Sequence, residues 1–413
     1  MARRPPTAVG WGGGLVVVRG RESRPHGEGA QRVQACKVLQ GQETLVNTGE
    51  SWPDVEMAWL RVRRMQTKLH LWATTDPGRR FDDVFNLVYH PDFLTVAWDR
   101  VRGNKGARTA GVDRVIPAFI SDDADVVAFL ADTRDRLKCR AFRPLPARER
   151  LIPKPGQAGK FRRLGIPSAM DRLVQASLVL VLEPIFEADF KPVSYGFRPK
   201  RRAQDAIAEI HYFGSRKYHW VFEADITACF DELAHFAILD RVRRRVTDKR
   251  VLALVKAFLK AGIMAEGGQI RDSDTGTPQG GIASPLLANI ALSVLDEHFC
   301  AKWDSHGTDM RRFTHRKRGG ATYRIVRYAD DFVIMVNGSQ AHAEVLWEEV
   351  ASVLAPLGCD CRRPNLEYVT STRVSTFWGS TSSGAARREP RRWWSMPIRR
   401  KRLWPRSRRR CGR

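Results

Sequence analysis

Residues 323–336 read YRIVRYADDFVIMV, two runs rich in β-branched and aromatic residues with two adjacent aspartates between them. Such runs favour β-strands, so the pattern predicts an antiparallel hairpin made of residues 323–327 and 332–336. Neighbouring residues on a regular strand point to opposite faces, whereas residues in a hairpin turn can reach the same side. We therefore expect Asp330 and Asp331 to lie together at the tip. An isolated Asp-Asp pair is more often a solvated acidic turn, so a second feature is needed before it indicates a site.

A third aspartate supplies that feature. In residues 221–233 (VFEADITACFDEL), Asp225 is expected near the end of a strand over residues 220–226, just before a helix over residues 230–245. For Asp225 alone, a helix N-cap is the alternative. Two-metal phosphoryl transfer needs carboxylates that hold two divalent ions about 4 Å apart, and Mg²⁺ takes few carboxylates because it keeps several waters. Together the three aspartates predict a site for two Mg²⁺ ions, with Mn²⁺ as a substitute.

Composition and charge narrow the class of protein. The 413 residues have an ordinary apolar content and a net charge of +25, which favours a polyanionic partner such as nucleic acid. Thirteen Lys or Arg and one Glu lie in residues 381–413, so about half of the excess charge belongs to this tail. The seven cysteines show no zinc or disulfide spacing and are expected to be reduced thiols. No apolar run is long enough for a membrane span and no signal peptide is visible, so we expect a soluble cytoplasmic protein without membrane contact.

Helix and strand patterns alternate along the chain, which predicts an α+β fold with a sheet covered by helices on one face. Helices are expected over residues 54–73, 203–213, 230–245, 249–259 and 341–354, and in a segment that Ser168 caps. Another helix should follow the Gly-rich loop 276–281, with Ser284 as its cap and Pro285 at its first position. Residues 151–155 and 160–166 predict a second hairpin, and residues 1–44 are expected to be disordered or foreign to the fold.

The tetrapeptide YADD at residues 328–331 resembles the corresponding box of group II intron-encoded reverse transcriptases, and four further blocks occur in that family's order. Residues 151–167 (LIPKPGQAGKFRRLGIP) are similar to the fingers hairpin, and residues 194–199 (SYGFRP), 222–231 (FEADITACFD) and 277–285 (TPQGGIASP) are similar to palm motifs. The resemblance spans residues 45–358. It implies the fingers and palm of a right-hand polymerase, with an N-terminal helical region at 45–117 and the fingers and palm domain at 118–358.

The resemblance also implies roles for matching residues. Asp225, Asp330 and Asp331 would hold the catalytic metals, with Asp331 the least direct ligand. Residues expected to contact the incoming deoxynucleoside triphosphate are Lys154, Arg162, Phe230 and Gln279, and those expected to contact RNA are Arg198, Arg316 and Lys317. Cations suit phosphate, and Phe230 would block a ribose 2′-hydroxyl. For Lys154 and Arg162 the alternative is a solvated basic hairpin, and for Arg316 and Lys317 it is a solvated charged loop over residues 311–318. For Phe230 the alternative is packing in the core.

The resemblance ends after Gly358. Residues 359–413 are rich in Arg, Trp, Ser and Pro where the family has an FLGF strand, a helical thumb and a maturase domain. Residues 373–384 (RVSTFWGSTSSG) can be encoded so that one added G gives EGFDFLGFHIQR, which contains the missing strand. We therefore hypothesise that one base was lost near the codon for Gly358. Residues 359–413 would then be out of frame and disordered, and the thumb and maturase domain would be missing.

The function predicted from the resemblance is an RNA-directed DNA polymerase of a group II intron, with an RNA-binding role in splicing and mobility. Its reaction would be Mg²⁺-dependent nucleotidyl transfer to a DNA 3′-end on an RNA template. Its partners would be intron RNA, a DNA target or primer, and deoxynucleoside triphosphates. Two alternatives stay open: a truncated remnant without activity, and a non-catalytic RNA-binding splicing factor. The sequence does not identify the intron, the target site or the oligomeric state.

Overall fold

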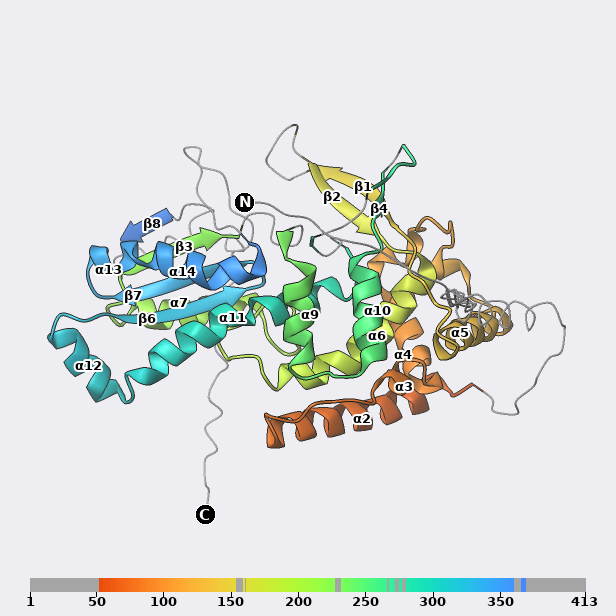
Figure 1. Ribbon diagram of the computed structural model, residues 1–413, viewed down its shortest axis with the longest axis horizontal. Helices are drawn as coiled ribbons and strands as arrows, with labels where there is room; N and C mark the ends of the chain where they lie inside the picture. The colour runs from red at the N-terminus through yellow and green to blue at the C-terminus, as the bar shows by residue number, and fades with distance from the viewer. Residues whose placement is uncertain are drawn as a thin grey trace, which may run out of the picture. The chain divides into compact units, whose positions relative to one another are not determined.

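Two four-stranded sheets organise the computed structural model (Figure 1). The structure describes residues 52–153, 159, 161–226, 232–265, 267–271, 275–276, 280–359 and 365–368. All of these residues belong to one compact unit. The disorder predicted for residues 1–44 concerns residues outside this described part.

The first sheet contains the predicted hairpin and has the strand order β6-β7-β3-β8. Its strands are β3 (Trp220–Asp225), β6 (Thr322–Tyr328), β7 (Asp331–Asn337) and β8 (Asn365–Tyr368). Every neighbouring pair is antiparallel. The strands β6 and β7 follow the β-branched runs of the sequence, and the α+β class with an antiparallel sheet is confirmed.

Helices bury the two faces of this sheet in separate cores. One face adds Phe222, Phe332 and Ile334 to the main core, which also contains side chains of α9 (His235–Arg243), α11 (Ser284–Ser305) and α14 (Leu346–Leu354). The opposite face, with Val221 and Val333, packs in a smaller cluster with α7 (Ala203–Gly214). Alternation of side chains along each strand divides the residues between the two cores. The prediction of helices on one face of the sheet agrees with the layer of α9, α11 and α14. The helix α7 also covers part of the opposite face, which was not expected.

The second sheet has the order β2-β1-β4-β5 and includes the predicted fingers hairpin. The strands β1 (Ala147–Pro153) and β2 (Phe161–Ile166) are antiparallel, and β1 also pairs in parallel with β4 (Ile263–Met264). A short strand β5 (Ile270–Arg271) completes the sheet. The base of the hairpin is buried, whereas its outer residues are exposed.

The predicted N-terminal helices are present as α2 (Val55–Thr75), α3 (Phe85–Val88) and α4 (Pro91–Gly103), followed by α5 (Asp123–Lys138). The helices α2, α3 and α4 pack against α6 (Ala169–Glu187), and α5 packs against α4, all within the main core. Pro184 inside α6 lacks the N–H that would bond to the Leu180 carbonyl, and Gln66 of α2 donates to that carbonyl instead at 2.9 Å. Ser168 caps α6 as predicted, since its hydroxyl accepts from the backbone N–H of Asp171 at 3.1 Å.

Three predicted helix boundaries differ in the structure. The helix expected from residue 230 begins at His235 as α9, and residues 227–231 lie outside the described part. The segment expected as one helix over 341–354 is divided into α13 (Gln340–Glu344) and α14. The N-cap of α11 is Ala283, not Ser284, and the Ala283 N–H donates to the side-chain oxygen of Gln175 at 3.2 Å. A long-range partner from α6 therefore caps α11. The helix α10 (Lys249–Leu259) has the predicted bounds. The basic segment 311–318, which was expected as a charged loop, instead lies mostly in a helix, α12 (Asp309–Lys317).

The prediction of disorder throughout residues 359–413 is wrong for residues 365–368, which form β8. This strand pairs with β3 from Trp220 opposite Tyr368 to Glu223 opposite Asn365. Backbone groups along the edge of β3 accept any extended segment as a partner, so strand pairing does not require a particular side-chain pattern. The rest of the tail after Cys359 lies outside the described residues, and the loss of reading frame stays a hypothesis.

Among the helices of the described part, none has the length and apolar character needed to cross a membrane.

Candidate active site

The tip of the β6–β7 hairpin is a two-residue turn, because Tyr328 pairs with Asp331. The turn consists of Ala329 and Asp330, so Asp331 is the first residue of β7 and only Asp330 lies in the turn itself. Ala329 has φ 58°, a left-handed conformation that is uncommon for residues other than glycine. Both aspartates are half-buried. The backbone thus holds two adjacent carboxylates at one end of the sheet.

The register of β3 brings the third aspartate to the same place. Asp225 pairs with Asp331 across the two antiparallel strands, although 105 intervening residues separate them in the chain. Residues directly opposite each other in such a pair have Cβ atoms about 5 Å apart. The structure describes Asp225 by its backbone alone. The convergence inferred from the sequence therefore holds for the backbone, and the metal-binding roles remain a prediction.

A completely buried arginine supports the turn from inside the protein. The Arg327 guanidinium donates to both carboxylate oxygens of Asp296 at 2.9 and 2.6 Å, and neither side chain is exposed to solvent. It also donates to the carbonyl of Ala329 at 2.9 Å, and further bonds reach Asn289 at 2.9 Å and Ser194 at 2.8 Å. This network was not predicted from the sequence.

The SYGFRP segment lies directly against the turn. Its backbone pairs with β6, since the Tyr195 N–H donates to the Arg327 carbonyl at 2.9 Å. The side chain of Asn289 donates to the Gly196 carbonyl at 2.8 Å. A Cβ atom at Gly196 would meet the Tyr328 carbonyl carbon at 2.9 Å and would come closer still to the Ala329 nitrogen. Only glycine lets this segment approach the turn so closely.

The same segment is anchored to α7 by a polar cluster. The Tyr195 hydroxyl donates to Glu209, which also accepts from Arg324 at 2.8 Å. Burial and the neighbouring Glu209 carboxylate raise the pKa of the Tyr195 hydroxyl, so it stays protonated and remains a donor. Segment 194–196 is therefore fixed on one side by α7 and on the other by α11 and β6.

The expected nucleotide contacts are only partly described. Arg162 lies on β2 opposite Ile152, and its side chain is exposed on the outer part of the fingers hairpin. Lys154, Phe230 and Gln279 lie outside the described residues. Their roles remain predictions.

Arg198 does not fit the predicted contact with the RNA template. It is buried, and its guanidinium binds the Glu187 carboxylate in a bidentate pair with N–O distances of 2.7 and 3.0 Å. It also donates to the carbonyls of Lys191 and Ser194 at 2.7 and 2.8 Å. Because the guanidinium N–H groups of Arg198 already donate to acceptors within the protein, Arg198 binds the start of the SYGFRP segment and not an RNA strand.

The two cations expected to bind RNA lie at the end of α12. Arg316 is half-buried and donates to the Thr322 hydroxyl at 3.1 Å. Lys317 is exposed, with its ammonium 5.0 Å from the centre of the Phe313 ring. Their contact with RNA stays a prediction.

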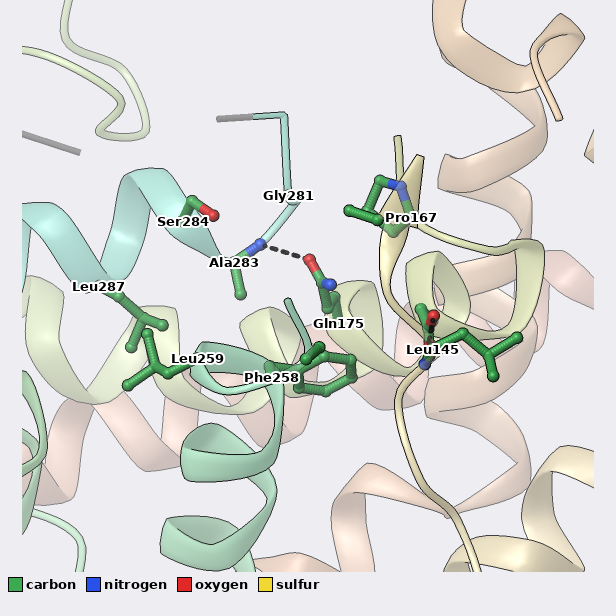
Figure 2. Close-up of a pocket in the computed structure, with 12 residues that line it drawn as sticks. Leu145, Pro167, Gln175, Phe258, Leu259, Gly281, Ala283, Ser284 and Leu287 are labelled. Carbon is green, nitrogen blue, oxygen red and sulfur yellow. Dashed lines mark hydrogen bonds between the residues drawn. The ribbon is translucent and has the colours of Figure 1, made fainter. Parts of the chain in front are cut away.

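A small cavity marks the junction between the fingers hairpin and the palm. Figure 2 shows it between Leu145 and Pro167 on one side and Phe258 and Leu287 on another, with the bond from Ala283 to Gln175 at its edge. Its volume of about 20 Å³ suits a single water molecule, not a nucleotide. The cavity is therefore a packing feature at the base of the hairpin.

The carboxyl of Asp171 lines this cavity and accepts from the backbone N–H of Leu145 at 3.2 Å. Burial raises the pKa of Asp171 from 3.8 to about 6. Between these values the folded state binds more protons than the unfolded chain, so the free energy of unfolding falls as pH rises. Above about pH 6 the charged carboxylate costs about 3 kcal/mol, because one pKa unit corresponds to about 1.4 kcal/mol.

We expect the Asp171→Asn variant to lose this part of the pH dependence, since an amide keeps an acceptor oxygen but does not titrate. Urea unfolding of both proteins at about pH 4 and about pH 7 measures it. The decrease in stability between the two pH values should be smaller in the variant by up to about 3 kcal/mol. Equal decreases in the two proteins would show that Asp171 does not carry the effect.

Comparisons with known proteins agree with this geometry. A family model described as reverse transcriptase (RNA-dependent DNA polymerase) matches residues 152–363. Protein YkfC of Escherichia coli (strain K12) is 37% identical over 311 residues, which cover 71% of this chain and 80% of that protein. The group II intron-encoded protein LtrA of Lactococcus lactis subsp. cremoris is 31% identical over 319 residues, 65% of this chain. An uncharacterised 91 kDa protein in the cob intron of Schizosaccharomyces pombe is 31% identical over 333 residues, 71% of this chain and 39% of that protein.

The chain spans 52% of the length of LtrA, about half of it. The matched family region includes β3, β6 and β7, and with them the three aspartates and the turn. The chain therefore belongs to the reverse transcriptase family, and within it to the group II intron-encoded reverse transcriptases and maturases.

Proposed function

We propose that this chain transfers deoxynucleotides to a DNA 3′-end on an RNA template, with Asp225, Asp330 and Asp331 holding two Mg²⁺ ions. The observation that carries the proposal is the register of β3 and β7, which pairs Asp225 with Asp331 beside the turn that contains Asp330. Three carboxylates at one end of a sheet suit a hard cation that prefers oxygen ligands. The ions would supply electrostatic stabilisation of the attacking and leaving oxygens, with Mn²⁺ as a substitute.

The three proposed metal ligands come from β3, from β7 and from the turn between β6 and β7. The described side chains alone contain no cluster of three or more His, Cys, Asp and Glu that could hold a metal ion. The proposal therefore depends on Asp225, whose backbone position places it next to the other two. The protein's own contribution is to hold the carboxylates at fixed separations, since catalysis of phosphoryl transfer consists largely of positioning and electrostatics.

The other functional residues complete the proposal by family resemblance. Lys154 and Arg162 of the fingers hairpin would meet the triphosphate, and Phe230 and Gln279 would contact the sugar and base. Arg316 and Lys317 would contact RNA backbone, which fits the exposure of Lys317 at the end of α12. We further propose residues 118–358 as the fingers and palm domain and residues 45–117 as its helical N-terminal region. Binding to intron RNA would support splicing and mobility.

The test is primer extension by the full chain on matched RNA and DNA templates, with deoxynucleoside triphosphates and Mg²⁺. We expect extension on the RNA template, full loss when a chelator removes the metal, and recovery when Mg²⁺ or Mn²⁺ is restored. Ribonucleoside triphosphates in place of the deoxy substrates serve as the control for sugar selection. A chain that binds RNA but extends no primer under any of these conditions would contradict the proposal. That result would favour a non-catalytic RNA-binding protein or an inactive remnant.

A further inference from the structure

We infer that Arg327 is a positioning residue for the turn that contains Asp330, and that α11 fixes this turn through it. The inference rests on the proposed polymerase function and adds a residue that touches neither substrate nor metal. Arg327 lies near the end of β6, three positions before Asp330, and its side chain is completely buried. Its guanidinium binds acceptors from α11, from the SYGFRP segment and from the turn itself.

The bond to the turn acts on a strained backbone. Ala329 has φ 58°, and such conformations of a non-glycine residue cost about 1–3 kcal/mol and persist where surrounding contacts determine them. One contact that does so here is the bond from the Arg327 guanidinium to the Ala329 carbonyl, at 2.9 Å. This carbonyl belongs to the peptide that leads into Asp330. Fixing it fixes the position from which the Asp330 side chain starts.

The same guanidinium nitrogen links the turn to its surroundings. It donates to the side-chain oxygen of Asn289 at 2.9 Å, and the Asn289 amide in turn donates to the Gly196 carbonyl at 2.8 Å. The carboxylate of Asp296, about two turns after Asn289 on the same face of α11, neutralises the charge of Arg327. The three contacting segments therefore share one buried group, and a shift of any of them displaces the turn.

Net stability does not account for this arrangement. Removing two charges from water is costly, and replacing a buried ion pair by apolar side chains of similar size is often neutral or stabilising. Apolar side chains would fill the same space between β6 and α11, but they would not bind the Ala329 carbonyl. What the ion pair adds is a directed bond to the peptide beside Asp330.

The test is a double variant of the full chain, Arg327→Met with Asp296→Leu, which replaces the buried ion pair by two uncharged side chains. We expect an unfolding midpoint close to that of the unchanged protein, primer extension slower by about 100-fold, and a higher Mg²⁺ concentration for half-maximal rate. A second readout needs neither substrate nor metal: hydrogen–deuterium exchange of the peptide covering residues 322–337 should become faster at the turn.

Arg241→Met is the matched control. Arg241 of α9 is also a buried arginine bound to α11, through Glu297 and Ser293, but it does not contact the turn. It should lower stability without changing the Mg²⁺ dependence or the exchange of residues 322–337. The same change in exchange in both variants would overturn the inference, because it would show a general loosening of the palm.

Asn289→Ala provides a milder variant should the double replacement fail to fold. It keeps the pair between Arg327 and Asp296 and removes the link to the Gly196 carbonyl. We expect about a tenfold loss of rate with faster exchange at the turn, since the variant loses the bonds of Asn289 to Arg327 and to Gly196, and a tenfold change corresponds to about 1.4 kcal/mol. A folded Asn289→Ala protein with unchanged exchange and Mg²⁺ dependence would overturn the inference. Lack of extension by the unchanged chain would contradict the proposed function alone, because exchange still reports on the turn.

Discussion

Primer extension on an RNA template is expected to fall by roughly 1,000-fold or more when Asp330 is replaced by asparagine, because a metal ligand contributes several kcal/mol to the transition state. Asparagine has nearly the same shape as aspartate, so the two-residue turn between Tyr328 and Asp331 should keep its geometry. What the replacement removes is the negative charge, and with it the affinity of the site for a divalent cation. The measurement is the single-turnover rate over a range of Mg²⁺ concentrations.

The neighbouring aspartate gives an internal comparison. The family resemblance implies that Asp331 is the least direct metal ligand. We therefore expect Asp331→Asn to lower the rate of primer extension less, on the order of tenfold. Asp309→Asn controls for loss of a surface charge, because the Asp309 side chain is 97% exposed at the start of α12 and lies outside the site. Equal rates for Asp330→Asn and Asp309→Asn, with both proteins folded, would exclude a role for the turn in metal binding.

Local signals in the sequence were sufficient for the parts of the fold that depend on neighbouring residues. The β-branched runs of β6 and β7 predicted the hairpin, and the serine–aspartate spacing predicted the cap of α6. Asp225 was identified through its place between a strand and a helix. The strand register that pairs it with Asp331 depends on the assembled sheet, and no local pattern specifies it.

The residues missed by sequence analysis are those whose partners lie far away in the chain. Arg327 shares β6 with one other basic residue, the half-buried Arg324. Alternation places the two on opposite faces, but both faces carry apolar residues, so the strand pattern does not show which arginine is completely buried. A signal was present in two of its partners: Asn289 and Asp296 are seven residues apart, about two helical turns, so they lie on one face of α11 at buried positions. Polar side chains at buried helical positions require partners, and this pattern would have indicated a buried polar network.

Two wrong predictions have the same physical origin. Arg198 was assigned to RNA because arginines suit phosphate, but a carboxylate eleven residues earlier, Glu187, occupies its guanidinium. Ser284 was assigned as a helix cap by its residue type, whereas the N–H of Ala283 is satisfied by Gln175 from α6. In both cases tertiary contacts satisfied a group that the sequence alone left to solvent or to its nearest neighbours.

Alanine at Gly196 is expected to displace the turn and to lower the rate of primer extension by about 100-fold, the cost of a misplacement of about 1 Å at a reacting centre. The added Cβ atom would meet the backbone of Tyr328 and Ala329, which has no flexible side chain that can move aside. The protein must then separate the SYGFRP segment from β6 or shift the turn. Either change stretches the bond from the Asn289 amide to the Gly196 carbonyl. Overpacking of this kind costs about 1–3 kcal/mol of stability.

Gly103→Ala at the end of α4 separates this steric effect from the general consequences of replacing glycine. A Cβ atom there would meet no atom within 4 Å, so the variant should be as stable as the unchanged protein or slightly more stable, with unchanged activity. Thermal unfolding and primer extension of both variants provide the measurement. If Gly196→Ala unfolds earlier but extends primers at the normal rate, the close approach serves stability alone. If it loses activity far beyond its loss of stability, the contact between the SYGFRP segment and the turn sets the position of Asp330.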